Sequence, residues 1–349
     1  MLYSYACTVP NEKVYPIFMK YLQKYGVSKD QHERAAATTI LGYIADPDSC
    51  LDLVRDDINS LTNFLVDRMQ DESYVVREAA GETVGRFSEH VCQDFLEKHK
   101  QVVPCLLKVI KDLYVSKHDM TIQKTLFALN EFVQNLDYDI KLYLEDIIKL
   151  LMEYINAPQF SRDVRYWALI ALSSTIAAAA KKILPYMQPL LDALHGIITA
   201  QGAANTQQSC KGQALMCAGK LAAACGKDKF PTQAIEVFTA FGLECLKEDN
   251  KFELRETAIS YFSDLTVLMK EEIAPVFDQV MTEVLKTCMK EDEYKQEFEE
   301  KKPDAGFSLD SDSEEPELMG IDVDVNTLDE KASAVNALGI IGCHAPVLC

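Results

Sequence analysis

Residues Asp71–Ser88 read DESYVVREAAGETVGRFS, and this stretch decides the fold. In it, Arg77 is followed by Ala80 three positions later and by Val84 and Gly85 seven and eight positions later. Positions i, i+3 and i+7 share one face of a helix, so the small and apolar residues can contact a neighbouring helix. We call this arrangement the frame, its first residue the anchor, and the helix that carries it a frame helix.

The frame recurs along the whole chain. Two of its other copies have lysine as the anchor, two lack the glycine, and one lacks the cation as well. Successive anchors lie 40 to 48 residues apart, except for one gap of 76. This period is typical of a helical repeat array, in which each repeat packs only against its neighbours. The anchors besides Arg77 are Arg34, Thr125, Arg165, Lys211, Arg255 and Lys331.

A second helix is expected after each frame helix. In three repeats it starts near a proline twenty residues after the anchor, where the ring suits a first helical turn. Apolar residues then follow at helical spacing. The predicted frame helices span 30–45, 72–89, 119–135, 162–180, 206–225, 251–269 and 328–342. The predicted second helices span 56–70, 93–115, 138–156, 184–200, 231–247 and 273–290.

The period predicts an all-α solenoid made of antiparallel helix pairs. We expect a partial repeat over 1–28, six repeats over 29–290, an acidic flexible insertion over 291–327, and a partial repeat over 328–349. No polar-faced capping repeat is visible at either end. We therefore expect the chain to be a piece of a longer array, either a truncated form or a short isoform.

Acidic or amide residues precede several anchors by six positions. Asp71 does so for Arg77, Asp249 for Arg255, and Asn205 for Lys211. In one interpretation, Asp–Arg pairs run from repeat to repeat and fix the register of the stack. In the other, these residues are ordinary N-terminal helix acids favoured by the helix dipole.

Composition narrows the possible functions. A net charge of −19 over 349 residues argues against binding to nucleic acid, whose phosphates need a basic surface. It suits basic partners, or it serves only solubility. The eleven cysteines contain no CxxC pair and fit small buried residues in a reducing compartment, either cytosol or nucleus. No apolar run approaches the roughly 20 residues that span a membrane.

The 76-residue gap contains an unusually acidic stretch. Residues Glu291–Glu330 hold 16 acidic residues against three lysines, which is −13 of the total charge. Such a segment cannot bury enough apolar surface to fold alone, so we expect a flexible loop. It either attracts basic partners or only solvates the chain. Its candidate binding residues are Asp310, Asp312, Glu314, Glu315, Glu317, Asp322 and Asp324.

Catalytic constellations are absent from the sequence. The six histidines are scattered without metal-ligand spacing, and there is no glycine-rich phosphate loop or nucleophile elbow. We predict no enzyme activity, no metal and no cofactor. Trp167, close to the anchor Arg165, is interpreted as a packing residue.

Several stretches together resemble the karyopherin-β import receptors (the importin-β superfamily), and most closely their importin four subfamily. They are VVREAAGETVGRFSEHV (75–91), ALNEFVQNLD (128–137), ILPYMQPLL (183–191), and DSEEPELMGIDVDV (312–325) followed by DEKASAVNALG (329–339). The resemblance covers nearly the whole chain and places it in the middle of a roughly three-times longer chain of HEAT repeats. The acidic loop followed by the DEK helix is its most specific part.

The resemblance implies nuclear import of basic cargo such as histones and ribosomal proteins. It also implies release by Ran in its GTP form, contact with Phe-Gly nucleoporins, and shuttling between cytoplasm and nucleus. It implies second helices that line a concave face, so acids on them become cargo candidates. The alternative is a HEAT scaffold in an assembly unrelated to transport. The candidates are Asp67, Asp139, Glu145, Asp146, Glu153, Glu236, Glu244, Glu248, Asp278 and Glu283.

Overall fold

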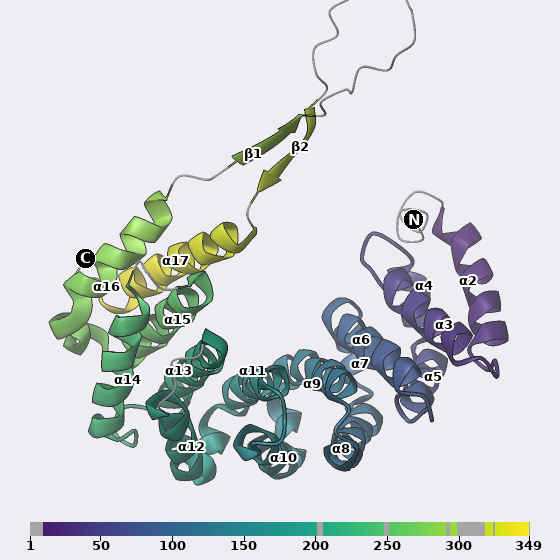
Figure 1. The fold of residues 1–349 in the computed structure, drawn as a ribbon, viewed down its shortest axis with the longest axis horizontal. Helices are drawn as coiled ribbons and strands as arrows, with labels where there is room; N and C mark the ends of the chain where they lie inside the picture. The colour runs from purple at the N-terminus through teal and green to yellow at the C-terminus, as the bar shows by residue number, and fades with distance from the viewer. Residues whose placement is uncertain are drawn as a thin grey trace, which may run out of the picture. The chain divides into compact units, whose positions relative to one another are not determined.

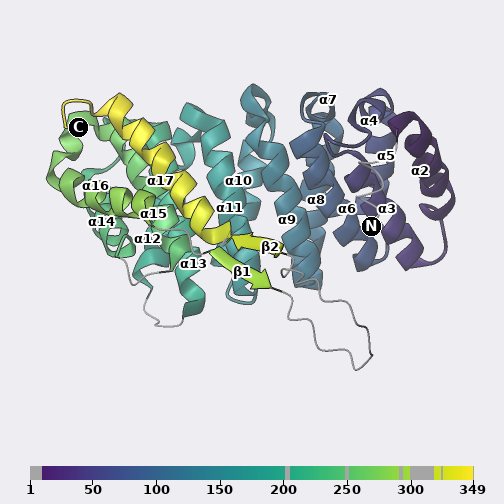
Figure 2. The same cartoon turned by 90° about the horizontal axis from the view of Figure 1, so that it is seen from above.

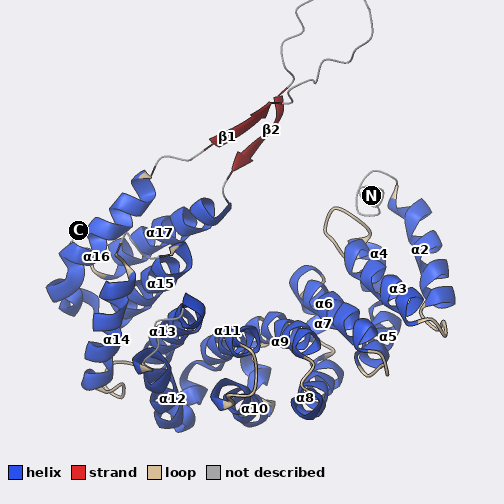
Figure 3. Ribbon diagram, in the orientation of Figure 1, coloured by secondary structure: helices blue, strands red, loops and turns tan. Residues whose placement is uncertain are grey.

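The computed structural model describes residues 10–200, 205–247, 251–290, 294–298, 318–323 and 325–348. It divides into two compact units, residues 1–235 and 236–349, with the boundary inside helix α14 (Thr232–Cys245). In the described ranges all regular structure is helical except for two strands (Figure 3). The predicted all-α repeat array is therefore confirmed.

Every predicted frame helix is present, with ends within a few residues of the prediction. Side chains define some of the starts: Asp30 accepts a hydrogen bond from the His32 N–H at 2.8 Å, and Ser161 caps the N–H of Val164. The frame helices are α3 (Gln31–Ile44), α6 (Tyr74–His90), α9 (Asp119–Gln134), α11 (Arg162–Ala179), α13 (Asn205–Cys225), α15 (Phe252–Met269) and α17 (Val325–His344).

The second helices are also present, and α2 (Asn11–Tyr25) precedes the first frame helix. Several predicted ranges combined a short helix with the longer one after it. The long second helices are α5 (Ile58–Met69), α8 (His99–Ser116), α10 (Leu144–Asn156), α12 (Met187–Thr199), α14, and α16 (Ala274–Met289). The short helices are α4 (Leu51–Asp56), α7 (Gln93–Leu96), η1 (Asp137–Leu142), η2 (Ala180–Tyr186) and η3 (Lys270–Ile273).

A turn with positive φ follows four of the frame helices, each time fifteen residues after the anchor. Only glycine adopts such backbone angles without crowding its Cβ, yet three of the four residues are not glycine. The same strained reversal therefore recurs where the chain leaves a frame helix. The residues and their φ angles are Cys92 (43°), Ala180 (46°), Gly226 (80°) and Lys270 (51°).

The helices of the N-terminal unit form two layers, one of frame helices and one of second helices (Figures 1 and 2). Successive frame helices pack extensively against each other, whereas successive second helices make much weaker contacts. In a curved two-layer array, the crowded layer is the one on the inner side. The frame layer is therefore the inner side of this unit. In the C-terminal unit, the frame helices α15 and α17 also pack extensively together.

Small residues make the close packing of the frame layer possible. A Cβ on Gly85 would overlap the ring of Phe127, and one on Gly81 would lie 2.9 Å from the carbonyl oxygen of Lys124. Ala80, directly before Gly81, is completely buried. The frame spacing thus allows neighbouring frame helices to approach closely, as the sequence predicted.

The anchor Arg34 makes the predicted pair with an acid of the next repeat. Its Nε and Nη2 donate to the two carboxylate oxygens of Asp71 at 2.9 and 2.8 Å, and its Nη1 donates to the carbonyl oxygen of Ser28 at 2.8 Å. Both side chains of the ion pair are more than nine-tenths buried. Burial raises the pKa of Asp71, but the hydrogen bonds from Arg34 and from the Ser73 N–H outweigh it, so the pKa lies below its ordinary value.

A comparable pair forms in the C-terminal unit with a different acid. Arg255 on α15 donates through Nε and Nη2 to Glu330 on α17 at 2.6 and 2.8 Å. Lys290, which follows α16, also reaches Glu330 at 3.2 Å. By the offset seen at Arg34, the corresponding position for Arg255 is Val325, which carries no charge. Asp249 corresponds to Lys211 and lies outside the described residues. The ladder interpretation is thus confirmed at Arg34, while Arg255 pairs with an acid that the spacing did not indicate.

The remaining anchors have other surroundings. The Nε of Arg77 donates to the backbone carbonyl of Asp71, and Lys211 Nζ donates to the carbonyl of Ala200 at 2.9 Å. The Nε of Arg165 is buried and has no hydrogen-bond partner. Lys331 lies on α17, one position after Glu330.

The acidic insertion departs from its prediction at both ends. Strands β1 (Tyr294–Phe298) and β2 (Leu318–Val323) pair antiparallel, with Tyr294 opposite Val323. The insertion therefore leaves and rejoins the array through a two-stranded stem, which the prediction of a wholly flexible segment missed. Asp322 lies on β2. The other predicted loop acids lie outside the described residues: Asp310, Asp312, Glu314, Glu315, Glu317 and Asp324.

The stretch Arg162–Thr199 contains an 18-residue window with a mean hydropathy of 1.4, which meets the length and composition criteria for a membrane span. The expectation of no such run was therefore wrong. In the structure this stretch is two helices, α11 and α12, separated at Ala180, and half of the window is buried within the fold. That burial is typical of core helices. All cysteines among the described residues are free thiols.

Candidate functional site

A hollow of about 460 Å³ opens on the frame layer of the N-terminal unit, where α6, α9 and α11 lie side by side. Its lining combines aromatic, acidic and basic side chains, which is uncommon on a plain solvated helix face. The lining residues are Glu82, Arg86, Glu89, Met120, Gln123, Lys124, Phe127 and Trp167.

Aromatic rings supply an apolar wall of this hollow. Phe127 and Trp167 meet edge to face with their ring centroids 5.6 Å apart, and both side chains are only partly buried. The backbone at Gly85 packs against the Phe127 ring and restricts its position. Trp167 was interpreted from the sequence as a packing residue. The structure gives it an accessible face in a hollow, where it can also contact a ligand.

Two cations of the hollow are already partnered. Glu82 accepts a hydrogen bond from Lys124 at 3.1 Å and from Arg86 at 3.3 Å, and Arg86 also stacks over the ring of Tyr43. Burial raises the pKa of Glu82, but these two cations outweigh it and bring the pKa below its ordinary value.

Glu89, which lines the hollow, and Glu131 on α9 form a less compensated acidic pair. Burial raises the pKa of Glu131, and the charge of Glu89 raises it further, while hydrogen bonds from Asn130 and Gln134 act in the opposite direction. Asn130 donates to Glu131 at 2.9 Å and accepts from Ser174 on α11 at 2.7 Å, which fixes the carboxylate. An incoming cation would relieve the repulsion between the two acids.

The C-terminal unit has a second acidic cluster on its frame helices. Burial raises the pKa of Glu256 on α15, and the charges of Asp329, Glu330 and Glu253 add to this effect. Ser333 on α17 donates to Glu256 at 3.2 Å. Crowded acids on frame helices therefore occur in both units.

The acids predicted from the sequence lie elsewhere. They occupy the second helices or the segments next to them, which in the N-terminal unit form the layer opposite the frame helices. The expectation that second helices line the inner face is therefore wrong for this unit. The described candidates are Asp67 on α5; Asp139 in η1; Glu145, Asp146 and Glu153 on α10; Glu236 and Glu244 on α14; and Asp278 and Glu283 on α16. Glu248 lies outside the described residues.

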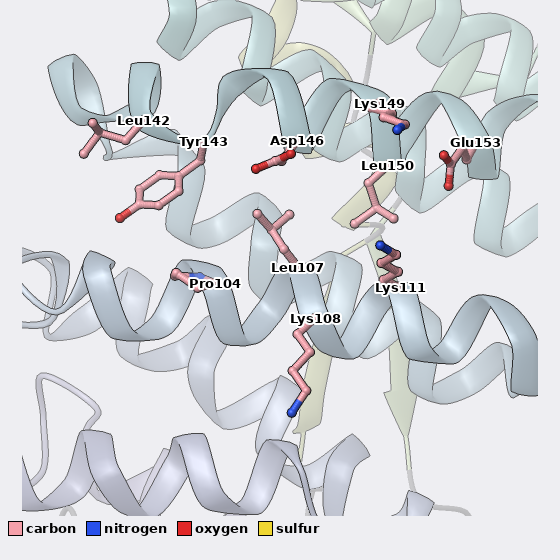
Figure 4. A pocket seen from close by; sticks show the side chains of 10 residues that line it. All are labelled: Pro104, Leu107, Lys108, Lys111, Leu142, Tyr143, Asp146, Lys149, Leu150 and Glu153. Carbon is pink, nitrogen blue, oxygen red and sulfur yellow. The ribbon is translucent and has the colours of Figure 1, made fainter.

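A second hollow, of about 560 Å³, lies between α8 and α10 in the second-helix layer. Figure 4 shows Leu107 and Leu150 facing the space between the two helices, with Tyr143 at one end. The Tyr143 hydroxyl is hydrogen-bonded to His99 Nδ1 at 3.0 Å. Lys108 points away and donates to Gln70, which follows α5, at 2.7 Å. The weaker packing of this layer leaves Leu107 partly exposed here, beside the buried Leu150.

Comparison with known proteins adds three findings. The family model described as "HEAT repeat" matches residues 61–91, which covers α5 and α6. In this match a second helix is followed by the next frame helix, whereas the predicted pairing joins each frame helix to the second helix after it.

Two curated relatives are similar to most of the chain. Importin-4 of Homo sapiens is 26% identical over 281 residues, which is 80% of this chain and 25% of that protein. Importin subunit beta-3 of Saccharomyces cerevisiae is 23% identical over 331 residues, which is 93% of this chain and 29% of that protein. The chain thus spans less than a third of the length of these relatives.

Solved structures share the fold. Kap121p bound to Pho4p superposes with a TM-score of 0.79 at 19% identity, covering 98% of this chain and 32% of that one. Kap121p bound to Nup53p superposes with a TM-score of 0.78 at the same identity and coverage.

Proposed function

The chain belongs to the karyopherin-β family, and from this premise we propose that it is a segment of a nuclear import receptor that binds basic protein cargo. Proteins of this family are transport receptors rather than enzymes, in agreement with the prediction of no catalysis. Histones and ribosomal proteins are suitable cargo because of their basic charge. The proposal includes shuttling of the parent protein between cytoplasm and nucleus.

The aromatic and acidic hollow on the frame layer carries this proposal. A lysine or arginine of the cargo would place its aliphatic stem and charge against Phe127 and Trp167 and would approach Glu89 and Glu131. Glu89 lies 3.7 Å from His90, and neither acid is paired with Lys124 or Arg86, the cations that neutralise Glu82. A bound cation would therefore stabilise both carboxylates.

A comparison of two double variants tests this assignment. Glu89→Gln with Glu131→Gln should weaken binding of a lysine-rich histone-tail peptide by roughly tenfold at low salt, because two charge-assisted contacts are lost. Asp146→Asn with Glu153→Gln removes the same charge from the second-helix layer and should leave the affinity nearly unchanged. Fluorescence anisotropy over a salt series measures both.

The opposite result would assign the cargo-binding surface to the second helices. If the α10 variant lost more affinity than the frame-layer variant, the cargo would bind on the second-helix layer and the frame-layer surface would be wrong. Trp167→Ala tests the aromatic contact separately from charge. It should lower the affinity for the histone-tail peptide at high salt as well as at low salt.

Nucleoporin contact is proposed for the other hollow. The apolar floor formed by Leu107 and Leu150 between α8 and α10 has the size and polarity for the phenylalanine side chain of a Phe-Gly segment. One of the structures with the same fold is Kap121p bound to Nup53p. Release by Ran in its GTP form is part of the same proposal, and a cargo pull-down with the longer parent protein, with and without Ran-GTP, tests it against the scaffold alternative.

A further inference from the structure

We propose that the N-terminal unit also binds a phosphate monoester, in a cationic cavity between α10, α11, α12 and α13. The cavity measures about 350 Å³, which is the size of a small-ligand site. Three cationic side chains line it, Arg162, Arg165 and Lys211, together with one acid, Asp192. Three cations around one cavity are unexpected in a chain with a net charge of −19.

Other copies of the same anchor show what a satisfied arginine looks like at this position. The Nε and Nη2 atoms of Arg34 both bind the carboxylate of Asp71, and the same two atoms of Arg255 bind the carboxylate of Glu330. In each case the acid comes from the next repeat and binds the guanidinium through two parallel hydrogen bonds. An arginine anchor can therefore receive an oxyanion with two oxygens. Arg77 is a different case, because its Nε donates to the backbone carbonyl of Asp71.

Arg165 lacks that acid. The sequence position that corresponds to Asp71 in the following repeat is Asn205, which has no charge. The Nε of Arg165 is buried and has no hydrogen-bond partner. A buried donor without an acceptor is costly, so this atom marks a place where a bound oxyanion would be stabilised.

The other charged groups of the cavity favour a doubly charged ligand. Lys211 donates to the carbonyl of Ala200 at 2.9 Å, which does not neutralise its charge. Arg162 pairs with Asp163 at 2.7 Å, and Asp192 accepts a hydrogen bond from Gln188 at 2.8 Å. The lining residues sum to a charge of +2, although Asp163 outside the lining offsets Arg162. A phosphate monoester, with about −1.5 to −2 at pH 7, can bind Arg165 and Lys211 together, whereas a single carboxylate carries only one charge.

This site is independent of the proposed cargo surface. Its ligand has the opposite charge, and its residues are not shared with the hollow around Trp167. The phosphate group can come from a phosphorylated side chain of a partner protein or from a free phosphorylated compound.

Binding of three probes to the full 349-residue chain, at constant ionic strength, tests the proposal. The probes are inorganic phosphate, a phosphoserine peptide with neutral flanking residues, and the same peptide with glutamate in place of phosphoserine. Isothermal titration calorimetry should detect the phosphopeptide and not the glutamate peptide. Tighter binding of the phosphopeptide than of phosphate indicates a protein source, and equal binding indicates a free compound.

Three variants assign the binding to this cavity. Arg165→Gln and Lys211→Gln should each weaken phosphopeptide binding by roughly tenfold, because each removes one charge-assisted contact. Lys149→Gln removes the same charge from an exposed position on α10 outside the cavity and should have no effect. If Arg165→Gln does not fold, Lys211→Gln decides the question, because its partly exposed side chain is not needed for the core.

Three results would overturn the proposal. One is the absence of binding to either phosphate probe. Another is equal loss of affinity in Lys149→Gln and Lys211→Gln, which would mean non-specific attraction. The last is equally tight binding of the glutamate peptide, which would make the cavity a carboxylate site.

Discussion

At the scale of single residues, the pair between Arg34 and Asp71 shows how one repeat fixes the next. Arg34 lies in the first turn of one frame helix, and Asp71 precedes the next frame helix, so the pair spans 37 residues of sequence. Its geometry is bidentate and its surroundings exclude water. Burying two charges costs desolvation energy, which their attraction offsets only while both are present. Removing one partner leaves the other charge buried and uncompensated, which strongly destabilises the fold.

Replacing Asp71 with asparagine should therefore be strongly destabilising. Asp71→Asn leaves the buried Arg34 guanidinium without its counter-charge, and we expect a loss of about 3–5 kcal/mol in the free energy of unfolding. Urea denaturation measures it. Glu72→Gln is the matched control, because Glu72 lies 3.7 Å from Arg34 but is 91% exposed, and it should change stability by less than about 0.5 kcal/mol. Equal losses would show that the pair does not fix the stack.

The same pair has a pH signature. The pKa of Asp71 in the folded protein is below its ordinary value, so the folded state binds fewer protons than the unfolded state at acidic pH. The stability contributed by Asp71 is present above pH of about 4 and is lost as the pH falls through the folded pKa. Wild-type stability should thus decline more steeply below pH of about 4 than that of Asp71→Asn. Parallel acid titrations of the two proteins would contradict this.

At the scale of elements, the sequence predicted the helices well and the connections poorly. The recurring frame located every frame helix, because its small and apolar residues lie on the face that packs against neighbouring helices. The turns at Cys92, Ala180 and Lys270 escaped prediction, because those residue types do not indicate positive φ. Only Gly226, at the equivalent position, carries the usual signal.

The strained turns predict changes in stability of opposite sign for two substitutions. Lys270→Gly should stabilise the chain by about 1 kcal/mol, because relief of backbone strain exceeds the entropy cost of glycine and the side chain is exposed. Gly226→Ala should destabilise it by a similar amount, since φ there is 80° and nothing else lies within 4 Å of the new Cβ. Thermal unfolding monitored by circular dichroism measures both.

A control separates the turn from a general effect of glycine. Lys251 is also an exposed lysine next to a helix, but its φ is −63°. Lys251→Gly should give no stabilisation. A gain in both lysine variants would remove backbone strain as the explanation.

At the scale of the whole molecule, the charge distribution is more informative than the fold. The sequence predicts the acidic insertion, because a charge run is visible without any structure. It missed the hollow around Glu89, Glu131 and Trp167, since these residues are far apart in sequence and meet only when frame helices stack. A signal was present: each lies on a frame helix, and only the wrong assignment of the inner layer directed attention to the second helices.

The insertion should act through its charge over a distance. Deleting residues 299–317 and joining β1 to β2 with a short Gly-Ser linker removes eight acids and two lysines. We expect the association rate for a lysine-rich peptide to fall several-fold at low salt and the difference to vanish at high salt. Stopped-flow fluorescence measures the rate. Equilibrium unfolding should not change.

A neutral replacement of equal length distinguishes charge from spacing. Changing the eight acids of 299–317 to their amides keeps the length of the segment and should reproduce the effect of the deletion. If the amide variant associates as fast as the wild type while the deletion does not, the segment acts as a spacer. If neither variant changes the rate, the insertion has no role in capture of basic ligands.

The unequal packing of the two layers has a mechanical consequence for the N-terminal unit. The frame layer is close-packed through glycine and alanine contacts, so it resists compression, whereas the helices of the second layer leave room between them. When this unit bends, distances within the frame layer therefore change little, and the second-helix layer takes up most of the change. Bending opens or closes the space between α8 and α10 while the distances around Glu89, Glu131 and Trp167 stay nearly constant. A ligand bound between α8 and α10 would make the N-terminal unit harder to bend. A ligand on the frame layer would instead keep nearly constant distances to its contact residues as the unit bends.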